Sequence, residues 1–191
     1  MVFTKIARAA AIIISLNLLA CHWAEIKKET SSVNRQTVSL DAFQIIGINT
    51  RTSNQDEMKG TGKIPALWNK FYSEQALSKI PGKLNSDIIA VYHDYESDAS
   101  APYSVLIGAK VAPGTKAPEG MELLNIPAQK YAKITSAKGE MPGVVIDAWK
   151  TVWNLTEKSE LNRTYTFDLE VYDQRTANPK SAEVDLFITI K

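Results

Sequence analysis

Few side chains in this sequence could carry out acid–base or nucleophilic chemistry. Its 191 residues include two histidines, His22 and His93, and a single cysteine, Cys21. Histidine is a common general base and cysteine a common nucleophile, but each needs partners within hydrogen-bonding reach. The spacing of these residues indicates no nucleophile–base pair and no cluster of metal ligands. We therefore expect no catalytic residues of these types, no metal and no cofactor.

The single cysteine follows a segment that is typical of bacterial export signals. Lys5 and Arg8 precede an apolar run, residues 9–19, that is too short to span a bilayer comfortably. Leu18-Leu19-Ala20-Cys21 then fits a lipobox, in which the cysteine becomes the acylated N-terminus. The pattern predicts a lipoprotein signal peptide at residues 1–20, export to the cell envelope and a lipid anchor to a membrane at Cys21. A secretory signal with a chance cysteine is the alternative.

Residues 21–39 follow the signal and predict a polar tether. They are rich in Lys, Glu, Thr and Ser and lack apolar periodicity, so we expect an extended or disordered chain. The folded domain is then predicted at residues 40–191. Acidic and basic side chains nearly balance, with a formal net charge of +1, and no basic run is present. Nucleic acid is therefore not an expected partner.

The predicted domain contains two copies of one supersecondary unit in tandem. Each copy has a strand, a helix and two further strands, at residues 43–50, 64–77, 87–95 and 103–111, and again at residues 129–137, 143–155, 164–172 and 183–190. The sequence thus predicts an α+β fold, a tandem β-α-β-β repeat with pseudo-twofold symmetry, in which two main helices pack on an antiparallel sheet. Clefts between such units are common sites for small ligands.

The predicted strand at residues 164–172 carries two acidic residues, Asp168 and Glu170. Residues 167–172 alternate, so that Glu170 shares a face with Tyr172. Matching Tyr95 with Tyr172 across the repeats places His93 at the position of Glu170. Alternation alone favours a solvated carboxylate, because glutamate is rarely buried.

Short segments spread over the predicted domain carry a family pattern. They are Ile46-Gly47-Ile48, Leu67-Trp68-Asn69-Lys70-Phe71, Asp94-Tyr95-Glu96-Ser97-Asp98, Pro102-Tyr103-Ser104-Val105-Leu106-Ile107-Gly108, Met141-Pro142 and Phe167-Asp168-Leu169-Glu170-Val171-Tyr172-Asp173. The chain resembles the GyrI-like effector-binding domain in these segments. The resemblance is closest to stand-alone members, including integron-associated effector-binding proteins, rather than to AraC-type regulators that add a DNA-binding domain.

The resemblance implies an aromatic-lined pocket with a glutamate on the penultimate strand at its floor. Glu170 matches that position. We predict a ligand-binding site formed by Glu170, Trp68, Tyr92, Tyr103, Trp149, Tyr172 and His93, with Trp153 as a further candidate for the wall. Simple packing of each tryptophan between helix and sheet is the alternative. The predicted export sets this chain apart from relatives that act in the cytoplasm.

Three functions remain open, and the sequence favours the first. The domain binds or sequesters small hydrophobic or cationic molecules, with Glu170 as the counter-ion. Alternatively, it hydrolyses strained small electrophiles with Glu170 as general base, aided by Tyr103 or Tyr172. In the third hypothesis it is a structural lipoprotein whose cleft is filled by side chains. The sequence leaves the ligand and the oligomeric state undetermined.

Overall fold

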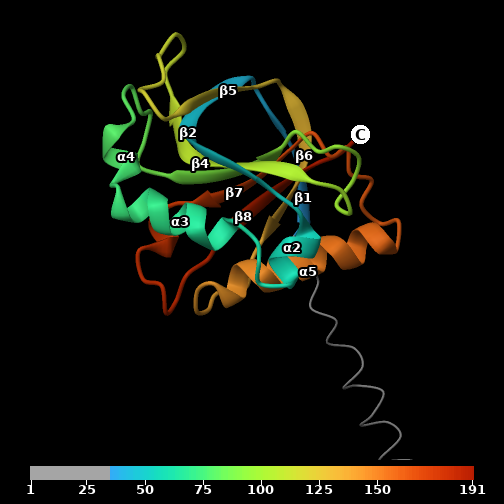
Figure 1. The fold of residues 1–191 in the computed structure, drawn as a ribbon. Coiled ribbons are helices and arrows are strands. Elements are labelled where there is room, and N and C mark those ends of the chain that lie inside the picture. Colours follow the sequence, from blue (N-terminus) through green and yellow to red (C-terminus); the bar gives the residue numbers. More distant parts are fainter. Residues whose placement is uncertain (1–34) are drawn as a thin grey trace, which may run out of the picture. The chain divides into compact units, whose positions relative to one another are not determined.

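The computed structural model describes residues 35–191, which form an eight-stranded antiparallel sheet with helices on one face (Figure 1). The predicted signal and Cys21 lie outside the described residues. The elements in chain order are β1 (Arg35–Leu40), β2 (Phe43–Thr52), α2 (Asn54–Met58), α3 (Ile64–Ser73), α4 (Ala76–Lys79), β3 (Ile88–His93), β4 (Tyr103–Val111), β5 (Glu122–Ile126), β6 (Gln129–Thr135), α5 (Gly143–Glu157), β7 (Phe167–Tyr172), the 3-10 helix η1 (Gln174–Thr176) and β8 (Asp185–Thr189).

The strand order shows the predicted repeat. The order is β1-β6-β8-β7-β3-β4-β2-β5, so the pseudo-twofold relates the halves across the central pair, β7 and β3. One half contains β2, α3, β3 and β4, and the other contains β6, α5, β7 and β8. The predicted α+β class, the antiparallel sheet and the paired β-α-β-β units are confirmed.

Two edge strands extend the predicted repeat. β1 precedes β2 in the chain but pairs with β6, and β5 precedes β6 but pairs with β2. Each half therefore lends its first strand to the other half. The prediction that the tether runs to residue 39 was wrong for residues 35–39, which belong to β1. Edge strands bury little of their surface, so this one lacks the apolar alternation that identifies inner strands.

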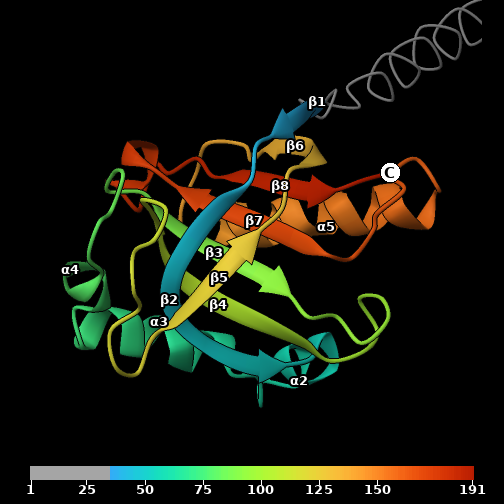
Figure 2. The ribbon, with the colours of Figure 1, turned by 90° about the horizontal axis from the view of Figure 1, so that it is seen from above.

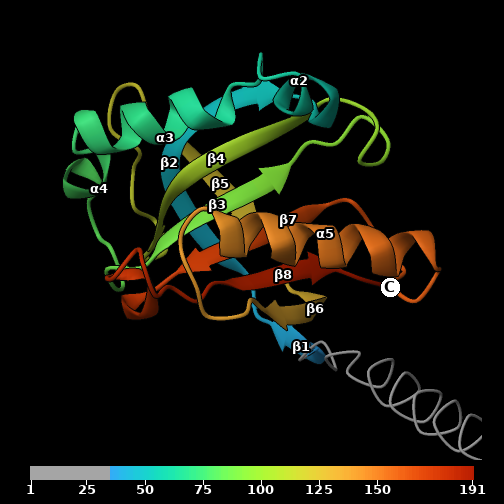
Figure 3. The same cartoon turned by 90° about the horizontal axis from the view of Figure 1, so that it is seen from below.

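The sheet separates two hydrophobic layers. Helices α3 and α5 lie on one face of the sheet (Figure 3). On that face α3 buries Leu67 and Phe71, and α5 buries Val145, Trp149 and Val152. These side chains continue the apolar stripes that recur every three or four residues in both helices. The opposite face encloses a second core, made by Ile45, Val91, Leu106, Tyr131 and Leu169 with apolar side chains of β1, β2 and β5.

A glycine pair allows β2 and β4 to approach closely. Gly47 and Gly108 face each other in the β2–β4 register. A Cβ at Gly47 would lie 2.2 Å from the Ile107 carbonyl oxygen, and a Cβ at Gly108 would lie 2.0 Å from that of Ile46. Any larger residue would force the strands apart. β2 bends strongly along its course, which takes the chain from one side of the sheet to the other (Figure 2).

The first helix differs from its prediction. It ends at Ser73, and Gln75 then adopts a left-handed backbone (φ 53°) before α4 begins. The segment between β2 and α3 contains the short helix α2. The Ser53 hydroxyl caps α2 by accepting the Asp56 amide hydrogen, with an N–O distance of 3.2 Å.

Candidate ligand-binding cleft

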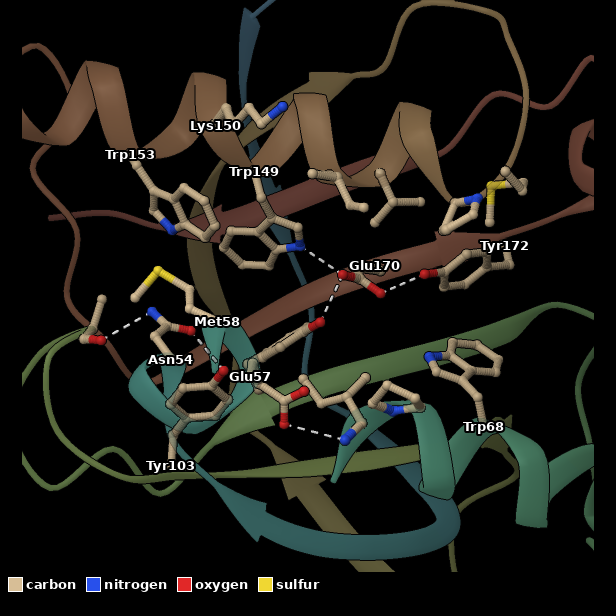
Figure 4. A pocket seen from close by; sticks show the side chains of 18 of the residues that line it. Asn54, Glu57, Met58, Trp68, Tyr103, Trp149, Lys150, Trp153, Glu170 and Tyr172 are labelled. Carbon is tan, nitrogen blue, oxygen red and sulfur yellow. Dashed lines mark hydrogen bonds between the residues drawn. The ribbon is translucent and has the colours of Figure 1, made fainter. Parts of the chain in front are cut away.

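A cleft of about 1440 Å³ lies over the sheet, with walls from α3 and α5 and one end closed by α2 (Figure 4). Side chains from β3, β4 and β7 form its floor, and most of its lining is apolar. Both halves of the repeat contribute to it. The cleft is thus the junction at which the sequence predicts a ligand site.

The Glu170 carboxylate occupies the centre of the floor, and its residue is only 2% exposed. Its Oε1 accepts hydrogen bonds from the Tyr92 hydroxyl at 2.7 Å and from the Trp149 indole at 2.6 Å. Its Oε2 accepts a hydrogen bond from the Tyr172 hydroxyl at 2.5 Å. Three neutral donors from β3, α5 and β7 therefore hold one carboxylate in place.

The environment of Glu170 favours the protonated acid more than water does. Burial raises the pKa of Glu170, and the hydrogen bonds from Tyr172, Trp149 and Tyr92 oppose this effect only in part. The pKa values of Tyr92 and Tyr172 are raised well above 10, first by burial and then by the charge of Glu170. Both phenols are therefore neutral donors and not phenolate nucleophiles.

No cationic side chain of residues 35–191 lies within 4.0 Å of the Glu170 carboxylate. The nearby Arg163 is paired with Asp168, and Lys150 at the cleft rim is paired with Asp147. The ionised carboxylate thus has hydrogen-bond donors but no counter-ion. This is the electrostatic condition under which an incoming cation gains most.

Aromatic rings surround the carboxylate. Trp68 meets the ring of Tyr172 edge-on at 5.0 Å between centroids, and Tyr92 meets Trp149 in the same way at 5.0 Å. Tyr103 lies 5.8 Å from Tyr92. Such contacts fix the rings, all of which line the cleft, and a cation bound there would be attracted to their π faces.

A second acid group lines the cleft and was missed by the sequence analysis. Glu57 Oε1 accepts the backbone N–H groups of Lys63 at 2.8 Å and Ile64 at 3.2 Å, so it caps the start of α3. The same oxygen accepts a hydrogen bond from the Thr52 hydroxyl at 2.6 Å. A side chain at Gly62 would collide with this carboxylate. These bonds assign Glu57 to holding α2 against α3.

The structure places six of the seven predicted site residues around this cleft: Glu170, Trp68, Tyr92, Tyr103, Trp149 and Tyr172. Trp153 also lines it and is 40% exposed at the rim. The lining residues that the sequence analysis did not single out include Asn54, Met58 and Arg163. Their segments carried no apolar period or charged motif that pointed to a shared cleft.

His93 is the exception, and its predicted place in the site was wrong. It follows Tyr92 on β3, so the two side chains point to opposite faces of the sheet. His93 stacks on Phe167 with 6.3 Å between ring centroids, and burial lowers its pKa. Matching Tyr95 with Tyr172 was therefore wrong in register, because Glu170 lies on the cleft face. The same geometry overturns the solvated alternative for Glu170.

The described residues add two further observations on possible partners. Within residues 35–191, no group of three or more His, Cys, Asp or Glu side chains is arranged to hold a metal ion. No helix in the same part of the chain has the length and apolar character to cross a membrane.

Comparisons with known proteins agree with this architecture. YobU of Bacillus subtilis, named as a transcriptional regulator, is 35% identical over 154 residues, 80% of this chain and 94% of YobU. The transcriptional regulator BrlR of Pseudomonas aeruginosa is 27% identical over 88% of this chain, which spans 58% of the length of BrlR. An integron cassette protein of Vibrio cholerae has a similar structure, with a TM-score of 0.65, 28% identity and coverage of 82% of this chain and 95% of its own.

A family comparison covers nearly all of the described residues. The sequence profile of the integron-associated effector-binding proteins, Cass2, matches residues 36–190. The match begins within β1 and ends just after β8, so it includes both halves of the repeat and the whole cleft. This chain belongs to the family of integron-associated effector-binding proteins.

Proposed function

We propose that the domain binds small hydrophobic cations in the cleft, with Glu170 as their counter-ion. The observation that carries the proposal is a buried carboxylate without a cationic partner, ringed by aromatic side chains. A carboxylate has about four acceptor sites, and three are used by Tyr92, Trp149 and Tyr172. The cation compensates the remaining charge and stacks on the ring faces, at about 0.5–2 kcal/mol per ring.

One solved structure of similar fold holds a ligand of the proposed class. SAV2435, which has been solved with bound tetraphenylphosphonium, has a similar fold, with a TM-score of 0.66, 13% identity and coverage of 83% of this chain and 94% of its own. Tetraphenylphosphonium is a delocalised cation surrounded by four aromatic rings. At this identity the comparison concerns the fold, and the proposal for this chain rests on Glu170 and its surroundings.

The other two functions receive less support from the geometry. A structural role required a cleft filled by side chains, whereas an open volume of about 1440 Å³ lies between α3 and α5. A general base needs a free acceptor site to take a proton, and hydrogen bonds from two phenols and an indole occupy three of the about four sites of the Glu170 carboxylate. We therefore expect a bound electrophile to be recovered unchanged.

Two ions of equal size and opposite charge provide the test. Tetraphenylphosphonium and tetraphenylborate present the same four rings, so they differ mainly in sign. We expect the phosphonium to bind and to raise the melting temperature, because ligands that bind only the folded state stabilise it. The borate should bind at least tenfold more weakly. Equal binding of both ions by isothermal titration would refute recognition of charge.

Two expectations from the sequence stand beside this proposal. We propose that the protein is exported and anchored through a lipid on Cys21, which would place the cleft outside the cytoplasm. The near balance of charge predicts no nucleic-acid partner, although two relatives carry the names of transcriptional regulators. Titration of labelled duplex DNA with the full chain, at low and moderate salt, would check this prediction.

A further inference from the structure

A buried arginine lies toward the end of the cleft lined by Tyr95, away from Trp68. The Arg163 side chain is only 2% exposed, and its Nη2 pairs with Asp168 Oδ2 at 2.6 Å. Asp168 also accepts hydrogen bonds from the Tyr95 hydroxyl at 2.9 Å and from the backbone and hydroxyl of Thr189 at 2.8 and 3.0 Å. The acceptor sites of the Asp168 carboxylate are thus all used in hydrogen bonds, whereas the Arg163 guanidinium has donors without a partner.

Arg163 has hydrogen-bonding capacity that its protein neighbours leave unused. A guanidinium carries five N–H donors. Within residues 35–191 only Nη2 donates a hydrogen bond, and Nε is buried with no partner. Two other buried polar atoms of the described residues lack partners, Asn49 Oδ1 and His93 Nε2, but neither residue lines the cleft. Arg163 is therefore the unsatisfied donor that belongs to the ligand site.

Aromatic rings fix the orientation of this guanidinium. Its Cζ lies 4.3 Å from the ring centroid of Tyr165 and 5.8 Å from that of Trp149. Tyr165 has a left-handed backbone (φ 53°), which indicates that the surrounding structure holds it against a conformational cost. Trp149 also donates to Glu170, so one indole contacts both charged groups of the cleft.

The spacing of the two charged positions suggests what the ligand carries. Asp168, which pairs with Arg163, and Glu170 are two residues apart on the same face of β7, a separation of about 7 Å along the strand. A single small molecule can span that distance. Nε is enclosed, but Nη1 is not, and Nη1 has no hydrogen-bond partner among residues 35–191. It is the donor that an oxygen acceptor of a ligand in the cleft could reach, and pairing it would stabilise the complex.

We propose that Arg163 forms a second subsite that binds an oxygen acceptor of the ligand, a carboxylate or carbonyl, while Glu170 binds its cationic group. The preferred ligands are then amphipathic cations that also carry an oxygen acceptor, rather than simple hydrophobic cations. This inference rests on the proposed function, because it concerns the same cleft.

Two phosphonium ions test the subsite. (4-Carboxybutyl)triphenylphosphonium and pentyltriphenylphosphonium share the cation and the number of chain carbons, and only the first ends in a carboxylate. We expect the wild type to bind the carboxylated ion at least as tightly as the pentyl ion, although its carboxylate is costly to desolvate. Arg163→Lys keeps a positive charge for Asp168 but removes the planar donor group. The substitution should lower the affinity for the carboxylated ion, relative to that for the pentyl ion, by about tenfold.

A measurement on the wild type covers the case in which Arg163→Lys unfolds. The side-chain Nε–H signals of the arginines can be followed by NMR, and Arg35, Arg51 and Arg175 lie outside the cleft lining and serve as internal controls. The carboxylated ion should shift the Arg163 signal, and the pentyl ion should shift it far less. Equal shifts, or an affinity ratio unchanged by Arg163→Lys, would overturn the subsite. Failure of both ions to bind would instead overturn the proposed function, and the subsite with it.

Discussion

Tyr172 donates its phenol hydrogen to the Glu170 carboxylate at 2.5 Å, although the two residues are separated by only one position on β7. Residues two positions apart on a strand point to the same face, so β7 alone positions both the acid and one of its hydrogen-bond donors. Tyr92 and Trp149 then complete the set from β3 and α5. Glu170 is therefore positioned by both halves of the repeat, and its properties lead to most of the following predictions.

Replacing the acid separates recognition of charge from the shape of the cleft. Glu170→Gln keeps the side-chain size and removes the charge. Affinity for tetraphenylphosphonium should fall by about tenfold or more, ~1.4 kcal/mol. Unfolding free energy without ligand should hold or rise, because a buried carboxylate without a counter-ion is unfavourable. Calorimetric titration and urea melts measure the two effects.

Glu74→Gln is the matched control for this substitution. Glu74 is exposed at the end of α3 and does not line the cleft, so its loss changes the net charge equally. It should leave the affinity within about twofold, since exposed charges at a distance are screened by salt. An equal loss in both variants would mean that net charge, and not the buried acid, attracts the cation.

The affinity for a permanently charged cation should depend on pH. Burial raises the pKa of Glu170 above the ordinary value of 4.5, and only the ionised form attracts the phosphonium. Affinity should therefore be low below the raised pKa and increase as the pH rises through it. Glu170→Gln should abolish this increase. A midpoint at or below 4.5 would show that the carboxylate is not buried as described.

The same shift sets the sign of a pH effect on stability. A raised pKa in the folded state means that the folded protein binds more protons than the unfolded chain between the two pKa values. Protonation of Glu170 therefore stabilises the folded state; this stabilisation is fully present below pH 4.5 and is lost as the pH rises through the folded-state pKa. Glu170→Gln should therefore be increasingly more stable than the wild type over that interval, as measured by urea melts.

Removing one donor should leave the carboxylate unsatisfied. Tyr172→Phe deletes the hydroxyl bonded to Glu170 Oε2 and keeps the ring against Trp68. The unfolding free energy should fall by about 1–3 kcal/mol at neutral pH. In a Glu170→Gln background the loss should be much smaller, because the charge is absent. Additive losses in this double-mutant cycle would contradict coupling between the two residues.

The position of β1 predicts where the folded domain begins. A chain starting at Arg35 should unfold at the same urea concentration as the longer chain. A chain starting at Asp41 lacks the strand paired with β6, together with Val38 and Leu40 of the second core. It should lose about 1–3 kcal/mol of unfolding free energy. Equal stability of both chains would show that β1 adds nothing to the fold.

The predicted anchor has its own test. Replacing Cys21→Ser should release the protein from the membrane fraction of the cell, because the lipid on this residue is the proposed attachment. Mass spectrometry of the wild type should find Cys21 acylated at the mature N-terminus. A soluble wild type with an unmodified Cys21 would contradict the lipoprotein assignment.

The sequence by itself determined the repeat and its class. Helical stripes that contain Trp68 and Trp149, and the alternation of residues 167–172, are local patterns with fixed periods, so they predict elements and buried faces without knowledge of the tertiary structure. The family resemblance added the pocket and the importance of Glu170.

Only the tertiary structure decided which side chains meet. β1 and β5 exchange between the halves, and edge pairing leaves almost no apolar signal in the sequence. The match between repeats placed His93 with Glu170, but the two side chains point to opposite faces of the sheet, so the register of that match was out by an odd number of residues. Arg163, Glu57 and Asn54 reach the cleft from loops and a short helix whose course depends on long-range packing. The local periodicity of apolar residues is thus enough to predict the type of fold. The site depends on strand register and on the exchange of β1 and β5 between the halves, which only the folded molecule fixes.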